Sequence, residues 1–389
     1  MSATIFTIEG KKFFCPLDFA EDNRFMVQSR PRSYYVNWDE TPNPFVKINQ
    51  VLANNSNNVL LIDEKILTLY GKDLQIPAER IFAANASENF KTLDGVTALL
   101  DFLYQHQITK SETLVVVGGG IIQDVGAFVG ACYKRGIRWV HFPTTLLSMC
   151  DSCIGGKTGI NYQQAKNQIA LFSSPAEVTI NPHFLKTLPD EALRSGLGEI
   201  LKLAITGGER FLTAYQSYVK DGEVDQWENY KPLILNALNI KSAVIEADEF
   251  EVHHRRSMNY GHTTGHAIEA LTNYAIPHGI AVVVGMIIAN ELSTQNNLLT
   301  ITEKNHLNKL CLELLDDNVF EILRTLNLDS LLDLLQKDKK VESDQIGFVM
   351  LKTLGDIAFL KLSLNPQLAQ AVKAALEKVI SHEPLLSTS

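Results

Sequence analysis

The chain has few cysteines and no long apolar run, and these absences exclude several classes of protein. Only five cysteines occur in 389 residues, which excludes a disulfide-rich extracellular scaffold. No stretch reaches the ~18 consecutive apolar residues that a membrane-spanning helix needs. The first residues lack the apolar segment of a secretory signal, and an acidic residue, Glu9, comes early. We therefore expect a reduced, cytoplasmic protein with no membrane partner.

An excess of positive charge is also lacking. The formal net charge is −9, from 44 acidic residues against 35 lysines and arginines. Sequence-independent binding to nucleic acid needs a basic surface, so we expect no nucleic-acid partner. The acidic total still permits an anionic substrate, because a local group of lysines can set the sign of the potential inside a binding site.

The periodicity of apolar residues divides the chain into two parts. Strand-like apolar runs and helical stretches alternate in the first part, which predicts a parallel sheet with helices on both faces. Helical periodicity dominates from about residue 187 onward. We predict an α/β N-terminal domain with a parallel sheet in residues 1–185, whose first ~30 residues form an extension without a clear pattern. A mostly α-helical C-terminal domain follows in residues 186–389.

Three glycines lie between an apolar strand and a helix. Gly118, Gly119 and Gly120 would let backbone N–H groups approach a pyrophosphate at the positive end of the helix. A bare glycine run fits a tight turn without a ligand equally well, and it is not the GxGxxG fingerprint. Asp124, one helical turn further on, would either bond a cofactor or favour the start of the helix.

Three histidines and a carboxylate suggest a metal site. His262 and His266 are four residues apart on one helix face, a spacing that suits a divalent cation, and His278 follows twelve residues after His266. Glu199 lies on another helix and shares a face with Lys202. A single histidine is usually a core or surface residue. Three of the ten histidines within seventeen residues, flanked by glycines, favour a catalytic zinc site with an open position.

Cys150 and Cys153 form a CxxC pair that lacks a second such pair. A four-sulfur metal site is therefore incomplete, and we interpret the two cysteines as small residues lining a turn in which Asp151 is the important member.

Basic residues gather around these motifs. Lys157, Lys166 and Asn167 lie in a glycine-rich, loop-like stretch without amphipathic periodicity. Lysines commonly form a solvated face, but this setting favours a loop that wraps a phosphate or carboxylate. Further basic residues precede and follow it: Arg135, Lys202, Lys241 and Arg255.

Taken in order, these motifs resemble the sugar-phosphate cyclase family and, within it, the dehydroquinate synthases. The likeness runs from about Val59 to about Asp356 and is strongest in VVVGGGIIQDVGAFVGACYKRGIRWVHFPTTLL, DSCIGGKTGIN, FLKTLP, GLGEILK and NYGHTTGHAIE. The resemblance implies a nucleotide-binding α/β domain, a helical metal-binding domain and an active site in the cleft between them. It also implies a carbon–oxygen lyase that oxidises its substrate transiently with NAD, eliminates phosphate and closes a carbocycle.

The resemblance also assigns roles to individual residues. It implies that NAD contacts Asp63, Glu88, Lys91, Gly118, Gly119, Gly120, Asp124, Thr144, Thr145 and Lys166. It implies that Zn²⁺ or Co²⁺ is held by Glu199, His262 and His278. The substrate is expected beside Asp151, Lys157, Asn167, Lys202, Lys241, Arg255, Asn259, His266 and a lysine of the pair Lys339–Lys340. Arg135 matches an arginine that reaches the phosphate across a dimer interface, which implies a homodimer.

The nature of the substrate rests on a few of these positions. Family members that act on sedoheptulose 7-phosphate, which has no carboxylate, tend to differ at Arg255, Asn259 and the second histidine. This chain keeps all three, which favours an acid substrate such as 3-deoxy-D-arabino-heptulosonate 7-phosphate. Departures from the family pattern, among them Thr264 and Ile280, surround the site without removing a proposed ligand.

Three alternatives stay open from the sequence. The first is a related cyclase of secondary metabolism that acts on another sugar phosphate, such as a 2-deoxy-scyllo-inosose synthase. The second is a metal-dependent polyol or glycerol dehydrogenase, in which Lys157, Lys166, Asn167 and Arg255 would be idle. The third is a non-catalytic relative, against which the intact set Glu199, His262 and His278 argues.

Overall fold

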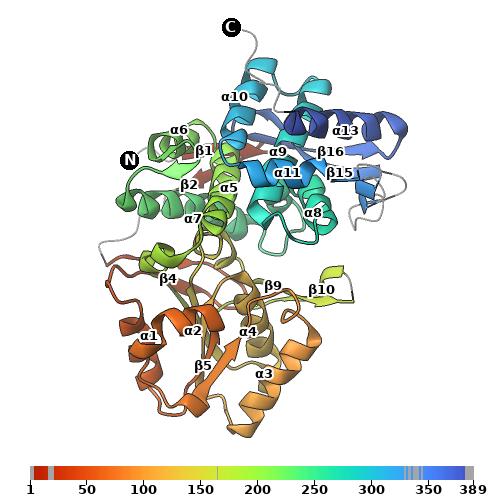
Figure 1. Cartoon of the computed structure of the whole chain (residues 1–389). Helices are drawn as coiled ribbons and strands as arrows, with labels where there is room; N and C mark the ends of the chain where they lie inside the picture. The colour runs from red at the N-terminus through yellow and green to blue at the C-terminus, as the bar shows by residue number, and fades with distance from the viewer. Residues whose placement is uncertain are drawn as a thin grey trace. The chain divides into compact units, whose positions relative to one another are not determined.

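The structure is a computed structural model that describes residues 4–15, 22–163, 165–327, 330–331, 334–335, 341–342 and 345–381. It divides into two compact units (Figure 1, in which the colour runs from red to blue along the chain). The first unit is Leu17–Pro189, and the second joins Met1–Pro16 to Asp190–Ser389. The sequence analysis places the start of the chain in the first domain, whereas the structure groups it with the second unit.

The first unit is built on a seven-stranded sheet in the order β3-β4-β11-β8-β7-β5-β6. All neighbouring strands are parallel except the antiparallel pair β3 and β4, so the predicted parallel sheet is confirmed. The strands are β3 (Arg24–Val27), β4 (Tyr34–Trp38), β5 (Val59–Asp63), β6 (Ile81–Ala84), β7 (Thr113–Gly118), β8 (Arg138–Pro143) and β11 (Glu177–Ile180).

Helices cover both faces of this sheet, α1 and α2 on one side and α3 and α4 on the other (Figure 1). Leu61 and Val116 pack with α3 and α4 in one apolar cluster. Successive strand residues point to opposite faces, so Leu60 and Val115 face the other layer and are equally buried. The helices are α1 (Phe45–Ala53), α2 (Glu64–Tyr70), α3 (Leu93–Gln105) and α4 (Gly120–Cys132).

The lysine-rich segment predicted as a loop is a hairpin. Strands β9 (Lys157–Tyr162) and β10 (Ala165–Phe172) pair antiparallel, and the register shifts between Ala165 and Ile169. Asn167 lies in this irregularity with a φ of 53°. Such a bulge bends the strand and re-aims side chains, which periodicity in the sequence does not reveal.

The second unit is mostly helical, as predicted. Its helices are α5 (Asp190–Gly207), α6 (Glu209–Tyr218), α7 (Tyr230–Ala247), α8 (His262–Leu271), α9 (His278–Gln295), α10 (Ile301–Leu312), α11 (Asp317–Arg324) and α13 (Pro366–Ile380). Helix α9 is the central element, because α5, α8, α10 and α13 all pack against it. Nearly all of its side chains are buried, which explains its almost continuous apolar sequence.

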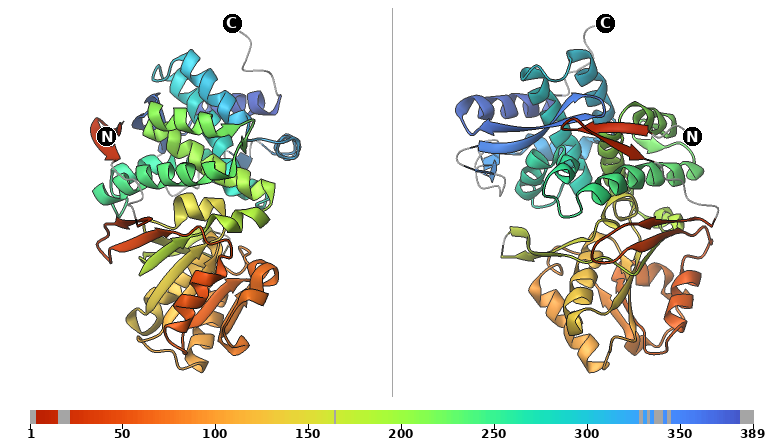
Figure 2. Two further views of the ribbon diagram at one scale, coloured as in Figure 1. Left: turned by 90° about the vertical axis from the view of Figure 1, so that its left-hand side faces the viewer. Right: turned by 180° about the vertical axis from the view of Figure 1, so that it is seen from behind.

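The second unit also contains a five-stranded sheet, β14-β15-β16-β1-β2, which the sequence analysis did not predict. Strand β1 pairs parallel with β16, so two strands that are far apart in the sequence lie side by side (Figure 2, right-hand view). Phe6 and Phe13 stack with ring centroids 5.3 Å apart on its buried face. The strands are β1 (Thr4–Ile8), β2 (Lys11–Cys15), β14 (Val341–Glu342), β15 (Gln345–Thr353) and β16 (Asp356–Ser363); a short hairpin, β12 (Val219–Lys220) and β13 (Glu223–Val224), is separate.

Among the residues that the structure describes, no helix is both long and apolar enough to cross a bilayer. The five cysteines all fall within those residues and are free thiols. Cys150 and Cys153 are buried, Cys150 within the short helical turn Ser148–Ser152 and Cys153 directly after it. The interpretation of this pair as small residues lining a turn therefore fits the structure.

Candidate active site

A buried carboxylate lies at the centre of the second unit. Glu199 on α5 is fully buried, and Lys202, one turn further on, is 1% exposed. Their spacing of three residues puts both on one face, and Lys202 Nζ lies 2.5 Å from Glu199 Oε2. An isolated buried carboxylate is strongly disfavoured, so Lys202 supplies part of the countercharge that keeps Glu199 ionised.

Glycines let two further helices approach Glu199 closely. A Cβ atom on Gly279 would lie 1.8 Å from the carbonyl oxygen of Ser195, and one on Gly198 would lie 2.6 Å from the carbonyl oxygen of Gly279. The start of α9 therefore touches the backbone of α5. The contact is fixed by a hydrogen bond from the Gly279 N–H to Ser195 Oγ. In the same way, a Cβ atom on Gly285 would lie 1.9 Å from the Gly261 carbonyl oxygen, which brings α8 against α9.

This packing places two imidazoles beside one carboxylate oxygen. His262 and His278 are the first residues of α8 and α9. Their Nε2 atoms lie 3.6 Å and 3.3 Å from Glu199 Oε1. The opposite ring nitrogens have other partners, since His262 Nδ1 lies 3.2 Å from the Tyr260 carbonyl oxygen and His278 Nδ1 lies 3.1 Å from Glu269 Oε2. An acceptor at Nδ1 selects the tautomer whose Nε2 lone pair is available to a cation.

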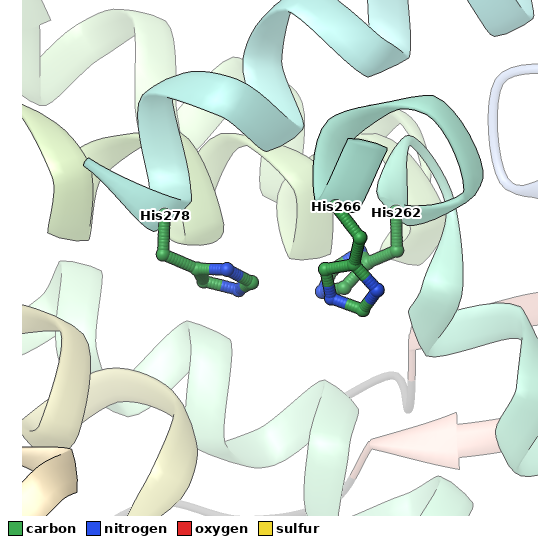
Figure 3. Close-up of side chains that lie close together, drawn as sticks. All are labelled: His262, His266 and His278. Atoms are coloured by element: carbon green, nitrogen blue, oxygen red, sulfur yellow. The ribbon is translucent and has the colours of Figure 1, made fainter. Parts of the chain in front are cut away.

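His266 is the third imidazole of this cluster. It lies one turn after His262 on α8, and the ligand atoms of His262, His266 and His278 all fall within 4.8 Å of one another. Figure 3 shows the three rings directed toward a common region from two helices. Unlike the other two, His266 is exposed, as expected for a histidine on the substrate side of the cluster. Its substrate-side role stays a prediction.

The electrostatics of the cluster suit a cation. Burial favours a raised pKa for Glu199, but Lys202 and His278 outweigh it and lower the pKa, so the group is anionic. Burial, with the charge of Lys202, lowers the pKa of His262 well below its usual range and keeps it neutral. Burial acts the same way on His278, but hydrogen bonds to Glu199 and Glu269 raise its pKa, so a cation that binds at Nε2 replaces a proton there. One carboxylate and two or three imidazoles fit a catalytic Zn²⁺ or Co²⁺.

Other predicted substrate residues of this unit come from elements that pack on α5. Lys241 on α7 is 7% exposed, and Arg255 in the short helical segment His254–Asn259 is 1% exposed. Asp248 shapes the loop before Arg255 by accepting N–H groups from Val252, His253 and Arg255. The Asn259 side chain donates to Glu251. The predicted Lys339–Lys340 pair lies outside the described residues.

The glycine turn of the first unit has the expected form. Gly118 ends β7, Gly119 is the N-cap of α4 and Gly120 is its first residue. A Cβ atom on Gly119 would lie 2.9 Å from Thr145 Cγ2, so the threonine segment after β8 packs directly on the turn. Thr144 also donates its N–H to the Gly118 carbonyl. The turn and the two threonines therefore pack together at the carboxyl ends of β7 and β8, the edge at which α/β sheets bind nucleotides.

Two ion pairs connect the remaining predicted cofactor residues. Lys91 Nζ lies 2.5 Å from the Asp124 carboxylate, and Lys166 Nζ lies 3.0 Å from that of Glu88. Asp124 on α4 is thus paired with Lys91, a residue that precedes α3, and its position one turn into its own helix did not reveal this partner. Asp63, by contrast, caps α2 by accepting the Lys65 N–H.

Four predicted residues lie in the turns and strand ends of this unit. Asp151 is half-buried in the helical turn after β8, and Lys157 is exposed at the start of β9. Arg135 is exposed beyond the C-terminal end of α4, where Lys134, Arg135 and Gly136 all have positive φ. Since α4 has 13 residues, Arg135 lies roughly 20 Å from the glycine turn. Asn167 lies in the bulge of β10.

The structure identifies two residues that the sequence analysis missed. Glu269 contacts His278, as described above. Asn161 on β9 donates to Glu88 Oε2 at 2.6 Å and accepts the Asn167 N–H at 3.1 Å, so it joins two predicted site residues. Asn161 belongs to the GIN motif beside the lysine segment, and Glu269 ends the HAIE motif, but neither position has a spacing that signals its role.

Comparisons with known proteins agree with this arrangement. Residues 81–195 match the family model described as 3-dehydroquinate synthase N-terminal, and residues 196–341 match the model described as 3-dehydroquinate synthase C-terminal. A 3-dehydroquinate synthase from Rippkaea orientalis is 36% identical over 70% of this chain and 75% of its own. One from Pelagibacter ubique is 36% identical over 82% of this chain and 89% of its own.

A solved structure supports the fold. The 2-epi-5-epi-valiolone synthase from Streptomyces hygroscopicus, with NAD⁺ and Zn²⁺ bound, matches with a TM-score of 0.76 and 22% identity. The match covers 92% of this chain and 99% of that one.

Proposed function

Because the chain belongs to the 3-dehydroquinate synthase family, we propose that it converts 3-deoxy-D-arabino-heptulosonate 7-phosphate to 3-dehydroquinate and phosphate. The observation that carries the proposal is the contact of Glu199 Oε1 with Nε2 of both His262 and His278, beside Lys202. A lyase of this kind depends on NAD and a divalent metal. Its steps are transient oxidation, phosphate elimination, reduction and intramolecular aldol closure, with no net redox change.

The residues present suit these cofactors. Glu199, His262 and His278 would hold the metal, with His266 on the substrate side. The glycine turn, Thr144, Thr145 and the carboxylates Asp63 and Glu88 would hold NAD. When bound, NAD would take a hydride from the ring carbon that bears a hydroxyl group and later return it, and the metal ion would polarise the substrate's oxygens.

The basic residues have a distinct task in the proposed reaction. Lys202, Lys241 and Arg255 are buried on neighbouring elements, so their charges act in a medium of low dielectric constant. Charges held in place before reaction stabilise oxyanions that develop in the transition state without reorganisation. Arg255 can also bind a carboxylate through two parallel N–H groups. Its presence favours an acid substrate over sedoheptulose 7-phosphate.

We further propose that the protein acts as a homodimer in which Arg135 of one protomer reaches the phosphate bound by the other. Its distance from the glycine turn of its own unit supports this role. Consecutive positive φ values also require the backbone at Lys134 and Arg135 to be held in place, and Lys134 Nζ donates to the Ile108 carbonyl at 2.6 Å. A cytoplasmic location stays a prediction.

The test is turnover with a sub-stoichiometric amount of NAD and added zinc. With the heptulosonate phosphate, we expect phosphate release to exceed the NAD supplied many times over, without accumulation of NADH. Accumulation of NADH without phosphate would replace the proposal with a polyol dehydrogenase. Turnover of sedoheptulose 7-phosphate in place of the acid would replace the substrate but keep the reaction class.

A further inference from the structure

Helix α8 presents three polar side chains along one face. His262, His266 and Glu269 are spaced by four and three residues, so they follow one another along a single stripe of the helix. The first and last of them are buried, with Glu269 5% exposed. A carboxylate is rarely buried to this extent without a specific partner. The buried carboxylate of Glu269 therefore needs a specific partner on this face of α8.

His278 is a partner of Glu269. Glu269 Oε2 lies 3.1 Å from His278 Nδ1, while His278 Nε2 lies 3.3 Å from Glu199 Oε1. The imidazole is thus held between two carboxylates. If the ring is neutral and its Nδ1–H donates to Glu269, the lone pair of Nε2 faces the anionic oxygen of Glu199. Two acceptors face each other in this way only when a proton or a metal ion lies between them.

The backbone fixes the position of Glu269. Its carbonyl oxygen accepts the N–H of Tyr274 at 2.9 Å and the hydroxyl of Thr272 at 3.1 Å. These bonds close the turn between α8 and α9, in which Asn273 and Tyr274 both have positive φ. The turn brings two residues nine positions apart into contact.

His262 is oriented differently. Its Nδ1 lies 3.2 Å from a neutral acceptor, the Tyr260 carbonyl oxygen. Tyr260 is itself buried and donates to Asn290, which in turn donates to Asn308. The two candidate ligands therefore have supports of unequal charge. A carboxylate partner makes an imidazole a stronger ligand than a carbonyl partner does, so His278 is the ligand that depends more on its support.

We propose that Glu269 is a positioning residue of the metal site: it holds the Nδ1–H of His278 and thereby directs the Nε2 lone pair to a divalent cation. This inference rests on the proposed metal site. Its test measures metal binding without turnover, so that the two proposals can fail separately.

The experiment compares the full-length wild type with Glu269→Gln and Glu269→Ala, each stripped of metal. Zn²⁺ affinity is measured by competition with a chromophoric chelator, and the geometry is followed by the visible absorption of bound Co²⁺. We expect Glu269→Gln to weaken Zn²⁺ binding by ~10-fold and Glu269→Ala by up to ~100-fold, with an altered Co²⁺ spectrum. The amide keeps an acceptor and the shape of the side chain, so Gln should lose less than Ala.

A matched control is Glu291→Gln. Glu291 on α9 is also buried and pairs with Lys304 and Lys378 at 2.9 Å and 3.0 Å, outside the imidazole cluster. We expect it to lower the melting temperature and leave the affinity for Zn²⁺ and the Co²⁺ spectrum unchanged. Wild-type affinity in Glu269→Gln would overturn the role of Glu269 alone. If wild type and His262→Ala bind Zn²⁺ equally weakly, the metal site and the role of Glu269 both fail.

Discussion

Gly279 and Ser195 are in direct backbone contact, and this contact sets the distance between the two helices that carry Glu199 and His278. A methyl group on Gly279 would lie 1.8 Å from the Ser195 carbonyl oxygen. No side-chain rotation relieves an overlap between backbone atoms, so α9 would have to move away from α5. His278 is the residue next to Gly279, so it would move with α9.

Gly279→Ala is therefore expected to destabilise the protein by about 1–3 kcal/mol or more and to weaken Zn²⁺ binding at least ~10-fold. Thermal unfolding and chelator competition check the two effects. The control is Gly347→Ala on β15, where a methyl group would meet nothing within 4 Å and φ is not positive. That variant should keep wild-type stability and affinity. Tight Zn²⁺ binding by Gly279→Ala would contradict the role of the glycine contact.

Much of this architecture could be predicted, because it depends on local patterns. The strand-to-helix turn at Gly118–Gly120 and the one-turn spacings of His262 with His266 and of Glu199 with Lys202 are set by residues close in sequence. Membership of the cyclase family, inferred from these motifs, is confirmed by the matches over residues 81–341.

Long-range contacts explain what could not be predicted. Strand β1 pairs with β16 at the other end of the chain, and no periodicity in the first residues reveals a partner so distant in sequence. Strands β1 and β2 also carry the exposed apolar residues Ile5 and Phe14 beside the buried Phe6 and Phe13. Apolar residues on both faces hide the alternation of apolar and polar residues that predicts a strand. Glu269 and Asn161 were missed for the same reason, since their roles come from side chains on other elements. The bulge at Asn167 made a strand look like a loop.

A buried histidine in the first unit should make stability depend on pH. His141 on β8 is 1% exposed, and within the described residues neither ring nitrogen has a hydrogen-bond partner. Burial lowers the pKa of His141 to about 3, from 6.5 in an exposed setting. Between these values the unfolded chain binds one proton more than the folded chain. The free energy of unfolding therefore contains the full contribution of the neutral His141 above the unfolded pKa. This contribution decreases as the pH falls below that pKa.

Urea unfolding between pH 7.5 and pH 4 measures this effect. We expect His141→Leu to reduce the loss of stability by roughly 1 kcal/mol per pH unit below about 6.5. His306→Leu, at an exposed histidine, serves as the control and should keep the wild-type slope. Equal slopes in all three proteins would show that the pKa of His141 does not differ between the folded and unfolded states.

Asn161 should support NAD binding through Glu88. Its side chain donates to Glu88 at 2.6 Å and holds the backbone of Asn167. Asn161→Ala is expected to weaken NAD binding ~10-fold, since each lost hydrogen bond to a charged group costs about 1.5–3 kcal/mol and part is regained from water. Titration calorimetry provides the measurement. Asn37→Ala removes a similar bond to Glu177, 2.7 Å long, between β4 and β11. An equal loss of NAD affinity in both variants would indicate a general loss of structure.

Lys202 should stabilise the fold most when no metal is present. Without its ammonium group, the fully buried Glu199 loses a countercharge 2.5 Å away, and breaking a buried pair costs about 3–5 kcal/mol. A divalent cation at Glu199 restores positive charge at the same carboxylate. Lys202→Met should therefore melt well below wild type in chelator, and added Zn²⁺ should raise its melting temperature by more than it raises that of wild type.

The control is Lys304→Met, which breaks the ion pair of Lys304 with Glu291, 2.9 Å long. It should lower the melting temperature, and added Zn²⁺ should raise that temperature only as much as it does in wild type. If Lys202→Met and Lys304→Met respond equally to Zn²⁺, the cation does not bind beside Glu199.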